Sequence, residues 1–584
     1  MATKQKKIAQ AKKDSAVQPK FFISNKQAWC VLAGICLTTC IIYFNALSFD
    51  FLHVWDDHAY ITENKAIRGL QWQNIKLFFT EFYAANYHPL TVLSYAIEYK
   101  FVGENAWLYH FDNIVLHIFN TILVFIFIRK ISPETQIVGL ITAAFFAVHP
   151  MHVESVAWVA ERKDVLYTFF FLLSLIFYVD YIKTNEVRFV FLSGVFFLLS
   201  CLSKPAAVVL PLVLFLLDYY LGRKFEWKVV AEKLPFLAIS LMFGMIAFRS
   251  QEVAMPIEQY SYFFNRVLLA SDSFIAYIAK AIVPANLSAF YPYPKEFTAT
   301  LPISYYLSLF LVGVIVFLVW YSLRLGKAVV FGFFFFAITI VLVLQIIAVG
   351  NASMADRYTY IPYIGLFFII GKAVANKIQN RNVILTIGLI LFYSAFSVAA
   401  FERVKYWKDG EVLFSDVIEK YPDCSTAYNN RGNHYILLAQ RSIPFNQNYL
   451  RLALSDFDRG NISNAEIHRY KGIEKELLND YSGALEEFNK ANRLSPENAK
   501  VYYNRGNVRR MLGDNTGAMD DYTKAIELFP QYLDAYNNRS LLRCVVKDYN
   551  GALADFDKVI EMTPNDTLAI KNRAAVKALI EKAE

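Results

Sequence analysis

The feature that most constrains this chain is a series of long apolar segments in its first two thirds. Eleven of them lie near residues 27–47, 107–129, 136–149, 164–182, 188–203, 205–222, 232–248, 303–322, 328–349, 360–376 and 382–402. The hydrocarbon core of a bilayer is about 30 Å thick, so a helix needs about 20 mostly apolar residues to cross it. Only 18% of the 584 residues are charged, against about a quarter in soluble domains, which excludes an ordinary soluble enzyme. We therefore predict a polytopic membrane helix bundle of about eleven spans.

The distribution of charge indicates which side of the membrane each loop faces. The net charge of +8 lies entirely in residues 1–402, because residues 403–584 are neutral, and a Lys-rich tail at residues 1–26 carries part of it. Positive flanks favour the cytoplasmic side. With an odd number of spans, a cytoplasmic tail places everything after residue 402 on the outer side. Residues 263–283 are apolar but contain three charges, so we expect an interfacial or re-entrant helix there instead of a span.

The last third of the chain is built from a repeat. Pro496, Pro530 and Pro564 are 34 residues apart, and glycines and alanines recur at the same interval. That period, with small residues where two helices cross and Pro after the second helix, is typical of tetratricopeptide repeats. Such repeats stack into an α-solenoid with a concave face. The predicted fold class is all-α, with a basic cytoplasmic tail over residues 1–26, the membrane bundle over residues 27–402 and an extracytoplasmic repeat domain over residues 403–584.

Charged and imidazole side chains gather in segments that we place at the outer ends of the spans. Charges beside spans are costly and are therefore functional candidates. Asp56 and Asp57 directly follow the first span, where adjacent carboxylates could serve as a general base or as metal ligands. The further candidates, as partners of a phosphate or a sugar, are His88, His149, His152, Glu154, Arg162, Lys163, Lys204 and Arg357. Imidazole with carboxylate suits a transition metal, but this spacing matches no zinc motif, and a solvated loop or headgroup anchor is the alternative.

Several of these segments together resemble a known family. In chain order, DFLHVWDDHAYITEN, HPLTVLSYAIEY, HPMHVESVAWVAERKDVL, LSKPAAVVL and ADRYTYIP, followed by the repeats, resemble the transmembrane and tetratricopeptide repeat-containing family. These proteins belong to the GT-C glycosyltransferase superfamily and are related to protein O-mannosyltransferases. The resemblance implies transfer of mannose from a polyprenyl-phosphate lipid to Ser or Thr, with inversion at the anomeric carbon.

The resemblance also implies roles for individual residues. An acidic residue of the first outer loop deprotonates the acceptor, and that position is Asp56 or Asp57 in this sequence, with Asp56 favoured. The cations available to steady the phosphate of the leaving lipid are Arg162, Lys163, Arg357 and Lys204.

One repeat position carries asparagine in three repeats, at Asn430, Asn504 and Asn538. In the arrays of O-GlcNAc transferase a resembling ladder of asparagines binds peptide backbone, because an amide can donate and accept at once. Helix-surface polarity or a hydrogen bond between repeats is the alternative reading. We predict that these residues bind the acceptor.

The sequence therefore predicts an inverting membrane glycosyltransferase that depends on a polyprenyl-phosphate sugar. Its expected partners are the lipid bilayer, the lipid-linked donor and an acceptor protein at the repeats, with no nucleic acid. No cofactor is assigned beyond the donor, and a divalent metal is left open. The alternatives are a non-catalytic membrane scaffold that recruits partners through its repeats, or an enzyme of the same fold acting on a lipid or a polysaccharide. We expect a bacterial inner membrane with periplasmic repeats, in preference to the endoplasmic reticulum with lumenal repeats.

Overall fold

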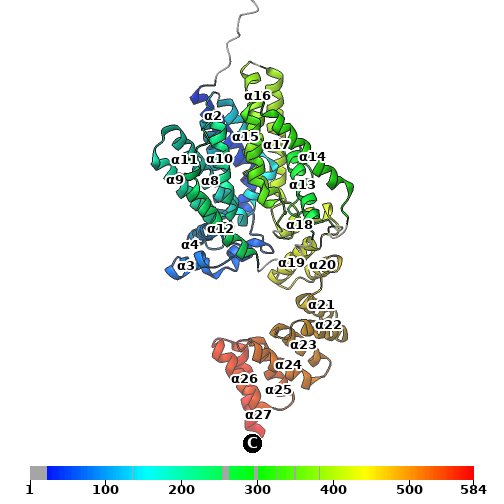
Figure 1. Cartoon of the computed structure of the whole chain (residues 1–584). Coiled ribbons are helices and arrows are strands. Elements are labelled where there is room, and N and C mark those ends of the chain that lie inside the picture. Colours follow the sequence, from blue (N-terminus) through cyan, green and yellow to red (C-terminus); the bar gives the residue numbers. More distant parts are fainter. Residues whose placement is uncertain are drawn as a thin grey trace, which may run out of the picture. The chain divides into compact units, whose positions relative to one another are not determined.

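The computed structural model describes residues 23–134, 136–252, 262–294, 297, 300–324, 326–347, 350–380 and 382–583. The predicted basic tail lies outside the described residues, apart from residues 23–26. The described chain is nearly all helical and contains no strand beyond isolated bridges, which confirms the all-α prediction. It divides into two units, Met1–Pro422 and Asp423–Glu584 (Figure 1).

The helices of the first unit account for all eleven predicted apolar segments. They are α2 (Asn25–Tyr43), α3 (Trp72–Thr80), α4 (Pro89–Val102), α5 (Ala106–Ile131), α6 (Gln136–Val148), α7 (Val153–Ala157), α8 (Arg162–Thr184), α9 (Val187–Ser203), α10 (Leu210–Leu221), α11 (Trp227–Ala231), α12 (Leu234–Glu252), α13 (Phe263–Lys280), α14 (Ile303–Ser322), α15 (Lys327–Ile340), α16 (Tyr363–Gln379), α17 (Val383–Lys405) and α18 (Gly410–Lys420). The segment predicted as an interfacial helix is α13.

Length and composition make this unit a multi-pass membrane protein. Within the described residues, six helices are long and apolar enough to span a bilayer, namely Asn25–Ser48, Ala106–Ile131, Val159–Thr184, Trp227–Gln251, Ile303–Ser322 and Val383–Lys405. A further pair, Gln136–Val148 with Pro150–Ala157, meets the same condition but is bent by 55° at its break. The remaining apolar helices are shorter, so the number of eleven spans stays a prediction.

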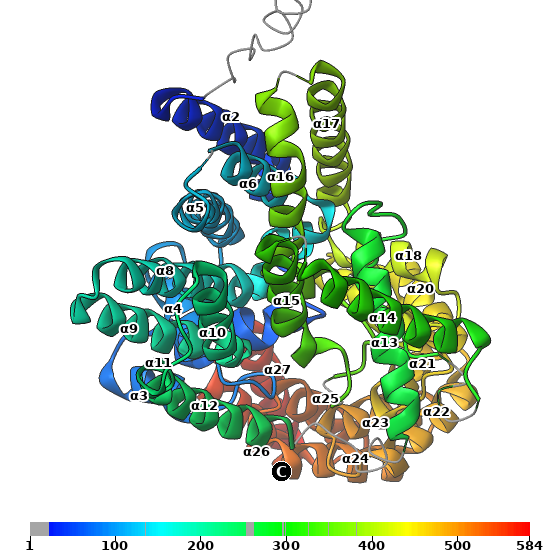
Figure 2. The ribbon, with the colours of Figure 1, turned by 45° about the horizontal axis from the view of Figure 1, so that its top comes forward.

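Close packing in the bundle depends on small residues where helices touch. A Cβ atom on Gly332 of α15 would lie closer than 3.0 Å to the backbone oxygen of Gly365 on α16, and the converse holds for Gly365. Only glycine allows the two backbones this near. Figure 2 shows α15 beside α16, and α16 beside α17.

The second unit consists of helix pairs with the predicted period. The pairs are α19 (Ser425–Arg441) with α20 (Gln447–Arg459), α21 (Ala465–Leu477) with α22 (Tyr481–Leu494), α23 (Ala499–Met511) with α24 (Asn515–Leu528) and α25 (Leu533–Val545) with α26 (Tyr549–Met562), followed by α27 (Thr567–Ala583). A Cβ on Gly432, Gly472 or Gly506 would meet the aromatic ring of the partner helix within 3.0 Å. These close crossings account for the three glycines, and the helix pairs confirm the tetratricopeptide fold.

Each of three repeats is also joined by a buried ion pair between its two helices. In the third, Arg505 donates from Nε and Nη2 to the two oxygens of Asp521, at 2.9 and 2.6 Å. Arg431 with Asp456 and Arg539 with Asp555 form the same paired contacts. Every one of the three aspartates is at least 97% buried, so these pairs belong to the repeat core.

The helix α18, which has the sequence of half a repeat, packs within the first unit. Asp416 accepts from Arg403 of α17 at 2.8 Å, and Lys420 donates to the backbone oxygen of Leu287 at 2.6 Å. The contacts divide the chain after Pro422, and the predicted boundary at residue 403 stays a prediction.

Candidate functional site

The carboxylate of Asp57 holds the loop after α2 against the turn before α8. Asp57 is 1% exposed and accepts from the backbone N–H of Leu52 and of Ala160, each at 2.8 Å. Burial raises the pKa of Asp57 to about 7, although these two hydrogen bonds act in the opposite direction. Both oxygens of Asp57 are therefore occupied, and the residue positions its neighbour.

Asp56 lies beside this anchor with a more accessible side chain. Its Oδ2 is 3.5 Å from Nζ of Lys163, at the start of α8, and its side chain is 31% exposed. Lys163 is only 7% exposed and also lies 3.1 Å from Oε1 of Glu161. The loop that follows the first helix and the turn before α8 thus bring together charges more than 100 positions apart in the chain.

Glu161 is the centre of the charged group. It is 1% exposed, and besides Lys163 it has Arg357 Nε at 3.2 Å and Lys204 Nζ at 3.9 Å. Within the described residues neither of its carboxylate oxygens has a hydrogen-bond partner of good geometry. Three cations from three separate segments therefore surround one buried carboxylate without saturating it.

Two more carboxylates complete this group. Glu154 of α7 accepts from the backbone N–H of Arg357 at 3.0 Å and is ion-paired with its guanidinium. Asp164 of α8 is ion-paired with Lys204, at the end of α9. We refer to Asp56, Glu154, Glu161, Lys163, Asp164, Lys204 and Arg357 as the Glu161 cluster. It holds four carboxylates and three cations.

His88 adjoins the Glu161 cluster through an aromatic residue. Its Nδ1 is 3.1 Å from the hydroxyl of Tyr60, whose ring lies 5.2 Å from the ammonium of Lys163. Burial, with the charges of Lys163 and Lys204, lowers the pKa of His88 well below its usual value. The imidazole is therefore neutral and suited to hydrogen bonding.

Arg162, one of the predicted phosphate cations, is directed away from the cluster. It is 1% exposed, and it donates to Glu98 at 2.6 Å and to the backbone oxygen of Tyr109 at 2.7 Å. A guanidinium that donates to groups on both helices braces α8 against α4 and α5. The structure thus brings Asp56 and Arg357 together with Lys163 and Lys204, but not with Arg162.

His149 and His152 also lie apart from the cluster, in an aromatic core. His149 Nε2 is 3.3 Å from the backbone oxygen of Ala281, and His152 Nδ1 is 2.8 Å from that of Phe146. Their rings pack against Tyr360 and Tyr363. The geometry connects them to helix packing and brings neither into contact with Asp56.

Three indole rings lie against the cluster and were not predicted as site residues. The centroids of Trp55 and Trp158 are 4.3 Å apart, and those of Trp158 and Trp407 are 5.6 Å apart. Lys163 and Arg357 lie over Trp158 at 5.8 and 5.7 Å. Trp55 precedes Asp56 in the chain, and that adjacency is the one sequence signal for this stack. Glu161 belongs to the charged run that carries Glu154 and Lys163, and that run is its signal in the sequence.

No three His, Cys, Asp or Glu side chains in the described part of the chain form a group that could hold a metal ion.

The asparagines of the repeats lie on α19, α23 and α25. Asn538 donates to the Tyr503 hydroxyl at 3.2 Å and to Oδ1 of Asn507 at 2.8 Å, and thus joins neighbouring repeats. Asn430 accepts from Asn429 at 3.4 Å. Binding of an acceptor by these asparagines stays a prediction.

Comparison with known proteins identifies relatives of both units. Residues 88–249 match the family model described as dolichyl-phosphate-mannose-protein mannosyltransferase, and residues 477–513 and 499–532 match tetratricopeptide repeat models. The first match includes Glu161, Lys163 and Lys204 but neither Asp56 nor Arg357.

The curated relatives are named as protein O-mannosyl-transferases. Protein O-mannosyl-transferase TMTC2 of Mus musculus is 33% identical over 156 residues, which are 25% of this chain and 18% of that protein. Protein O-mannosyl-transferase F38B6.6 of Caenorhabditis elegans is 24% identical over 416 residues, 67% of this chain and 58% of that protein. The chain thus covers less than two thirds of each relative. Among solved structures, the first TPR of Spaghetti (RPAP3) bound to an HSP90 peptide matches 20% of this chain and 94% of its own, at 23% identity and a TM-score of 0.20. These curated relatives are animal proteins and give no support to a bacterial inner membrane.

Proposed function

We propose that this chain is a member of the TMTC-like family with tetratricopeptide repeats and that it transfers mannose from a polyprenyl-phosphate lipid to Ser or Thr hydroxyls of proteins. The family match supports the class of reaction. The Glu161 cluster supports the place, because a buried group of opposed charges at the ends of spans is expected where charge develops during a reaction.

The observation that carries the proposal is the difference in exposure among the acidic residues. Asp56 is 31% exposed, whereas the side chains of Glu154, Glu161 and Asp164 are no more than 3% exposed. A hydroxyl acceptor is a weak nucleophile and must touch its general base. Asp56 is the carboxylate of the cluster that an acceptor can reach.

The cations supply the second half of the reaction. Lys204 and Arg357 are each 17% exposed, so both reach the surface of the cluster while remaining paired with carboxylates. Donors of this kind stabilise the charge that grows on the phosphate of a departing lipid. One accessible carboxylate agrees with a single displacement, which inverts the anomeric carbon and needs a base but not the carboxylate nucleophile of a retaining glycosidase.

The repeats would bind the acceptor protein on the same side of the membrane as Asp56. This assignment follows from the positive-inside orientation and from the concave surface that tetratricopeptide arrays offer to peptides. That side is the lumenal or periplasmic one.

The test is transfer by the purified full chain in lipid, with a polyprenyl-phosphate mannose and a Ser/Thr-rich peptide. We expect Asp56→Asn to lower the rate by about 100-fold or more, because it removes the general base. Asp50→Asn is the matched control, since Asp50 lies in the same loop with a side chain that is 64% exposed. Full activity in Asp56→Asn would overturn the assignment of the base. If the wild type transfers only to a lipid or a polysaccharide, the acceptor class is wrong, and if it transfers to nothing, the scaffold alternative replaces the enzyme.

A further inference from the structure

Residues 403–421, which we call the connector, run from the end of α17 through α18. Although α18 has the sequence of half a repeat, several side chains of the connector are as buried as those of the bundle core. Trp407, Phe414 and Asp416 are 1%, 1% and 5% exposed. The connector therefore packs as part of the first unit, and its neighbours in that unit indicate its role.

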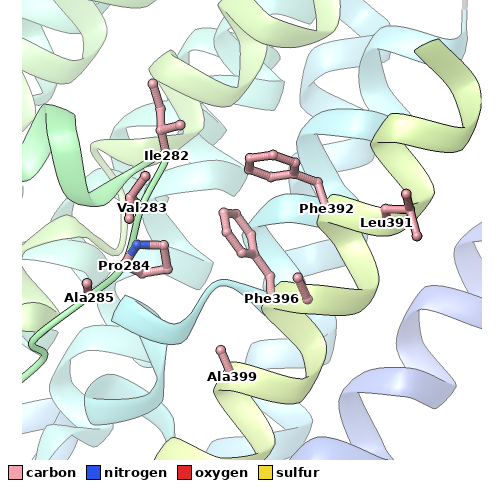
Figure 3. A pocket seen from close by; sticks show the side chains of 9 residues that line it. Ile282, Val283, Pro284, Ala285, Leu391, Phe392, Phe396 and Ala399 are labelled. Atoms are coloured by element: carbon pink, nitrogen blue, oxygen red, sulfur yellow. The ribbon is translucent and has the colours of Figure 1, made fainter. Parts of the chain in front are cut away.

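The helix that leads into the connector is itself loosely packed. Within the apolar stretch of α17, 11% of the residues are buried. An apolar groove of about 480 Å³ lies between α17 and the segment after α13, and Figure 3 shows Phe392 and Phe396 projecting from α17 towards Ile282 and Val283. Since α17 has few buried contacts of its own, the position of its C-terminal end depends largely on the connector.

One side of the connector packs against the loop that carries Asp56. The ring of Trp407 is stacked on that of Trp55, with 6.4 Å between the centroids and 10° between the planes. Phe414 of α18 lies 5.5 Å from the same indole. Trp55 directly precedes Asp56 in the chain, so two rings of the connector hold the residue before the proposed base.

Trp407 also supports the ring that lies beneath two cations of the Glu161 cluster. Its centroid is 5.6 Å from that of Trp158, and Lys163 and Arg357 lie over Trp158 at 5.8 and 5.7 Å. Trp158 and Trp407 are 2% and 1% exposed, and in the described part of the chain neither indole N–H has a hydrogen-bond partner. A buried indole usually has one. Burial of both rings without one costs stability, which indicates a role beyond packing.

The other side of the connector reaches Asp356, which directly precedes Arg357 in the chain. The ring of Tyr421 packs 6.1 Å from that of Tyr291. The Tyr291 hydroxyl donates to Oδ1 of Asp356 at 2.6 Å. The connector thus supports the start of the short helix that carries Arg357.

A buried ion pair acts at the same place. Asp416 accepts from Nη1 of Arg403 at 2.8 Å, and the two side chains are 4% and 7% exposed. Burial raises the pKa of Asp356, and the charge of Arg403 opposes this rise. The guanidinium of Arg403 therefore acts both on a carboxylate of the connector and on the carboxylate next to Arg357.

We propose that Trp407 and Asp416 of the connector are positioning residues of the transfer reaction. Trp407 acts on Asp56 through the stacked indoles, and Asp416 acts through Arg403 on the segment that carries Arg357. This inference rests on the proposed function, since it names the residues that hold that reaction's base and one of its cations in place. The part of the chain that serves the reaction then extends to residue 421, past the last apolar helix.

The first test is steady-state transfer by the full chain in lipid. Trp407→Leu keeps an apolar side chain but removes the stacked ring. We expect kcat to fall by about tenfold or more at an unchanged KM for the peptide, because a small displacement of a reacting group is enough for such a loss. Trp407→Phe, which keeps a ring, should recover most of that loss. Phe414→Leu, which removes the other ring against Trp55, repeats the test if Trp407→Leu does not fold.

Phe335→Leu is the matched control for the loss of a buried ring. Phe335 is fully buried, and its ring packs against Phe127 and Phe331, which lie outside the Glu161 cluster. We expect it to keep the wild-type kcat per folded molecule. An equal fall of kcat in Phe335→Leu, or a wild-type kcat in Trp407→Leu, would overturn the role of Trp407.

Asp416→Asn tests the other side of the connector. It removes the charge that holds Arg403, and we expect kcat to fall by about tenfold, again at an unchanged KM for the peptide. Asp416→Glu, which keeps the charge, should recover most of the loss. Glu419→Gln is the matched control, because Glu419 is exposed on the same helix. A wild-type kcat in Asp416→Asn would overturn the role of Asp416.

Hydrogen exchange tests positioning without any transfer. We expect residues 51–60 to exchange about tenfold faster in Trp407→Leu and residues 353–360 to do so in Asp416→Asn, with α9 and α10 unchanged. Faster exchange confined to these segments supports the inference even if the wild type transfers no mannose, in which case only the proposed function fails. If the wild type transfers but both variants exchange as it does, or exchange faster in every helix alike, the inference is wrong and the proposed function stands.

Discussion

The buried ion pairs of the repeats and the Glu161 cluster use the same residue types in opposite ways. In a repeat, Arg505 and Asp521 meet through two short hydrogen bonds, and the same pair recurs in other repeats. In the Glu161 cluster, three cations lie 3.1 to 3.9 Å from Glu161 and neither oxygen has a hydrogen bond of good geometry in the described structure.

The comparison teaches how to tell a structural charge from a functional one. A saturated bidentate pair can take no further ligand, and its periodic recurrence ties it to the repeat fold. An unsaturated buried carboxylate is costly for the fold, so its retention calls for another reason. The predictions below test this distinction, in order of decreasing effect.

The largest effect is expected from Glu161→Gln. The substitution leaves Lys163, Lys204 and Arg357 without their shared counter-charge, so both the geometry around Asp56 and the cations for the leaving phosphate are disturbed. We expect the transfer rate to fall by about 100-fold or more. The measurement is the initial rate per folded molecule.

The double substitution Glu161→Gln with Lys163→Met separates fold from function. It restores the net charge of the cluster, and the remaining carboxylate that loses its cation is Asp56, which is 31% exposed. It should therefore recover much of the thermal stability without recovering transfer. If the double variant transfers at the wild-type rate, the cluster is a structural network like the pairs of the repeats.

The second prediction applies the same change to a repeat. Asp521→Asn removes the charge that Arg505 and Arg509 share, at 2.6 and 2.9 Å, and leaves a buried guanidinium unpaired. We expect the repeats to lose about 3–5 kcal/mol. Hydrogen exchange of α23 and α24 in the full chain measures the loss, and transfer at saturating acceptor should be unchanged.

Lys524→Gln is the control for that experiment, since its pair with Glu527 is about half exposed on both sides. Exposed pairs contribute little to stability, so exchange should not change beyond about 0.5 kcal/mol. A fall in the rate of transfer at saturating acceptor in Asp521→Asn would contradict a purely structural role.

The third prediction concerns the pH dependence of stability. The pKa of Asp57 is about 7 in the fold, against an ordinary value of 3.8. Between these values the folded chain keeps a proton that the unfolded chain has lost, so the free energy of unfolding falls as pH rises. The stabilisation is complete below about pH 4 and is lost by about pH 7, at about 1.4 kcal/mol per unit of pH. Glu154 and Asp164, whose pKa values burial raises to about 7 and about 6, give a slope of the same sign in both proteins. Melting temperatures taken from pH 4 to 8 should therefore fall more steeply in the wild type than in Asp57→Asn. An equal slope in both proteins would exclude Asp57 as its source, and Asp50→Asn should behave as the wild type does.

The sequence predicts some parts of this molecule far better than others, for physical reasons. Apolar length and a period of 34 are local properties, so helices and repeats can be assigned from them without knowing any tertiary contact. The direction of a side chain at the start of a helix is not local. Arg162 and Lys163 are neighbours in the chain, yet one faces Glu98 and the other faces Asp56. Successive residues of a helix point about 100° apart, so the packing of α8 against its neighbours decides which partner each of them faces.

Two further features depend on contacts between distant segments. Glu161 lies at the centre of its cluster because Lys204 and Arg357, from distant segments of the chain, both pack against its carboxylate. Trp407 joins Trp55 and Trp158 from beyond the last span. The sequence shows each of these residues but carries no signal that they meet, whereas the adjacent pair Asp56 and Asp57 could be singled out from the chain alone.

The smallest effect is expected from the asparagines of the repeats, which could act either as part of the repeat fold or as ligand-binding residues. Asn538 already bonds to Tyr503 and Asn507, so Asn538→Ala should cost about 1 kcal/mol of stability through the lost hydrogen bonds between repeats. Asn504 occupies the same position one repeat earlier. If it binds acceptor backbone, Asn504→Ala should raise the KM for the peptide about fivefold at unchanged kcat, because one amide hydrogen bond is worth about 1 kcal/mol. Steady-state kinetics and thermal unfolding of both variants give the answer. If both variants lose stability and keep the wild-type KM, the asparagines are part of the repeat fold, as the Arg–Asp pairs are. If only Asn504→Ala raises the KM, Asn504 binds the acceptor through an amide that the repeat fold does not use.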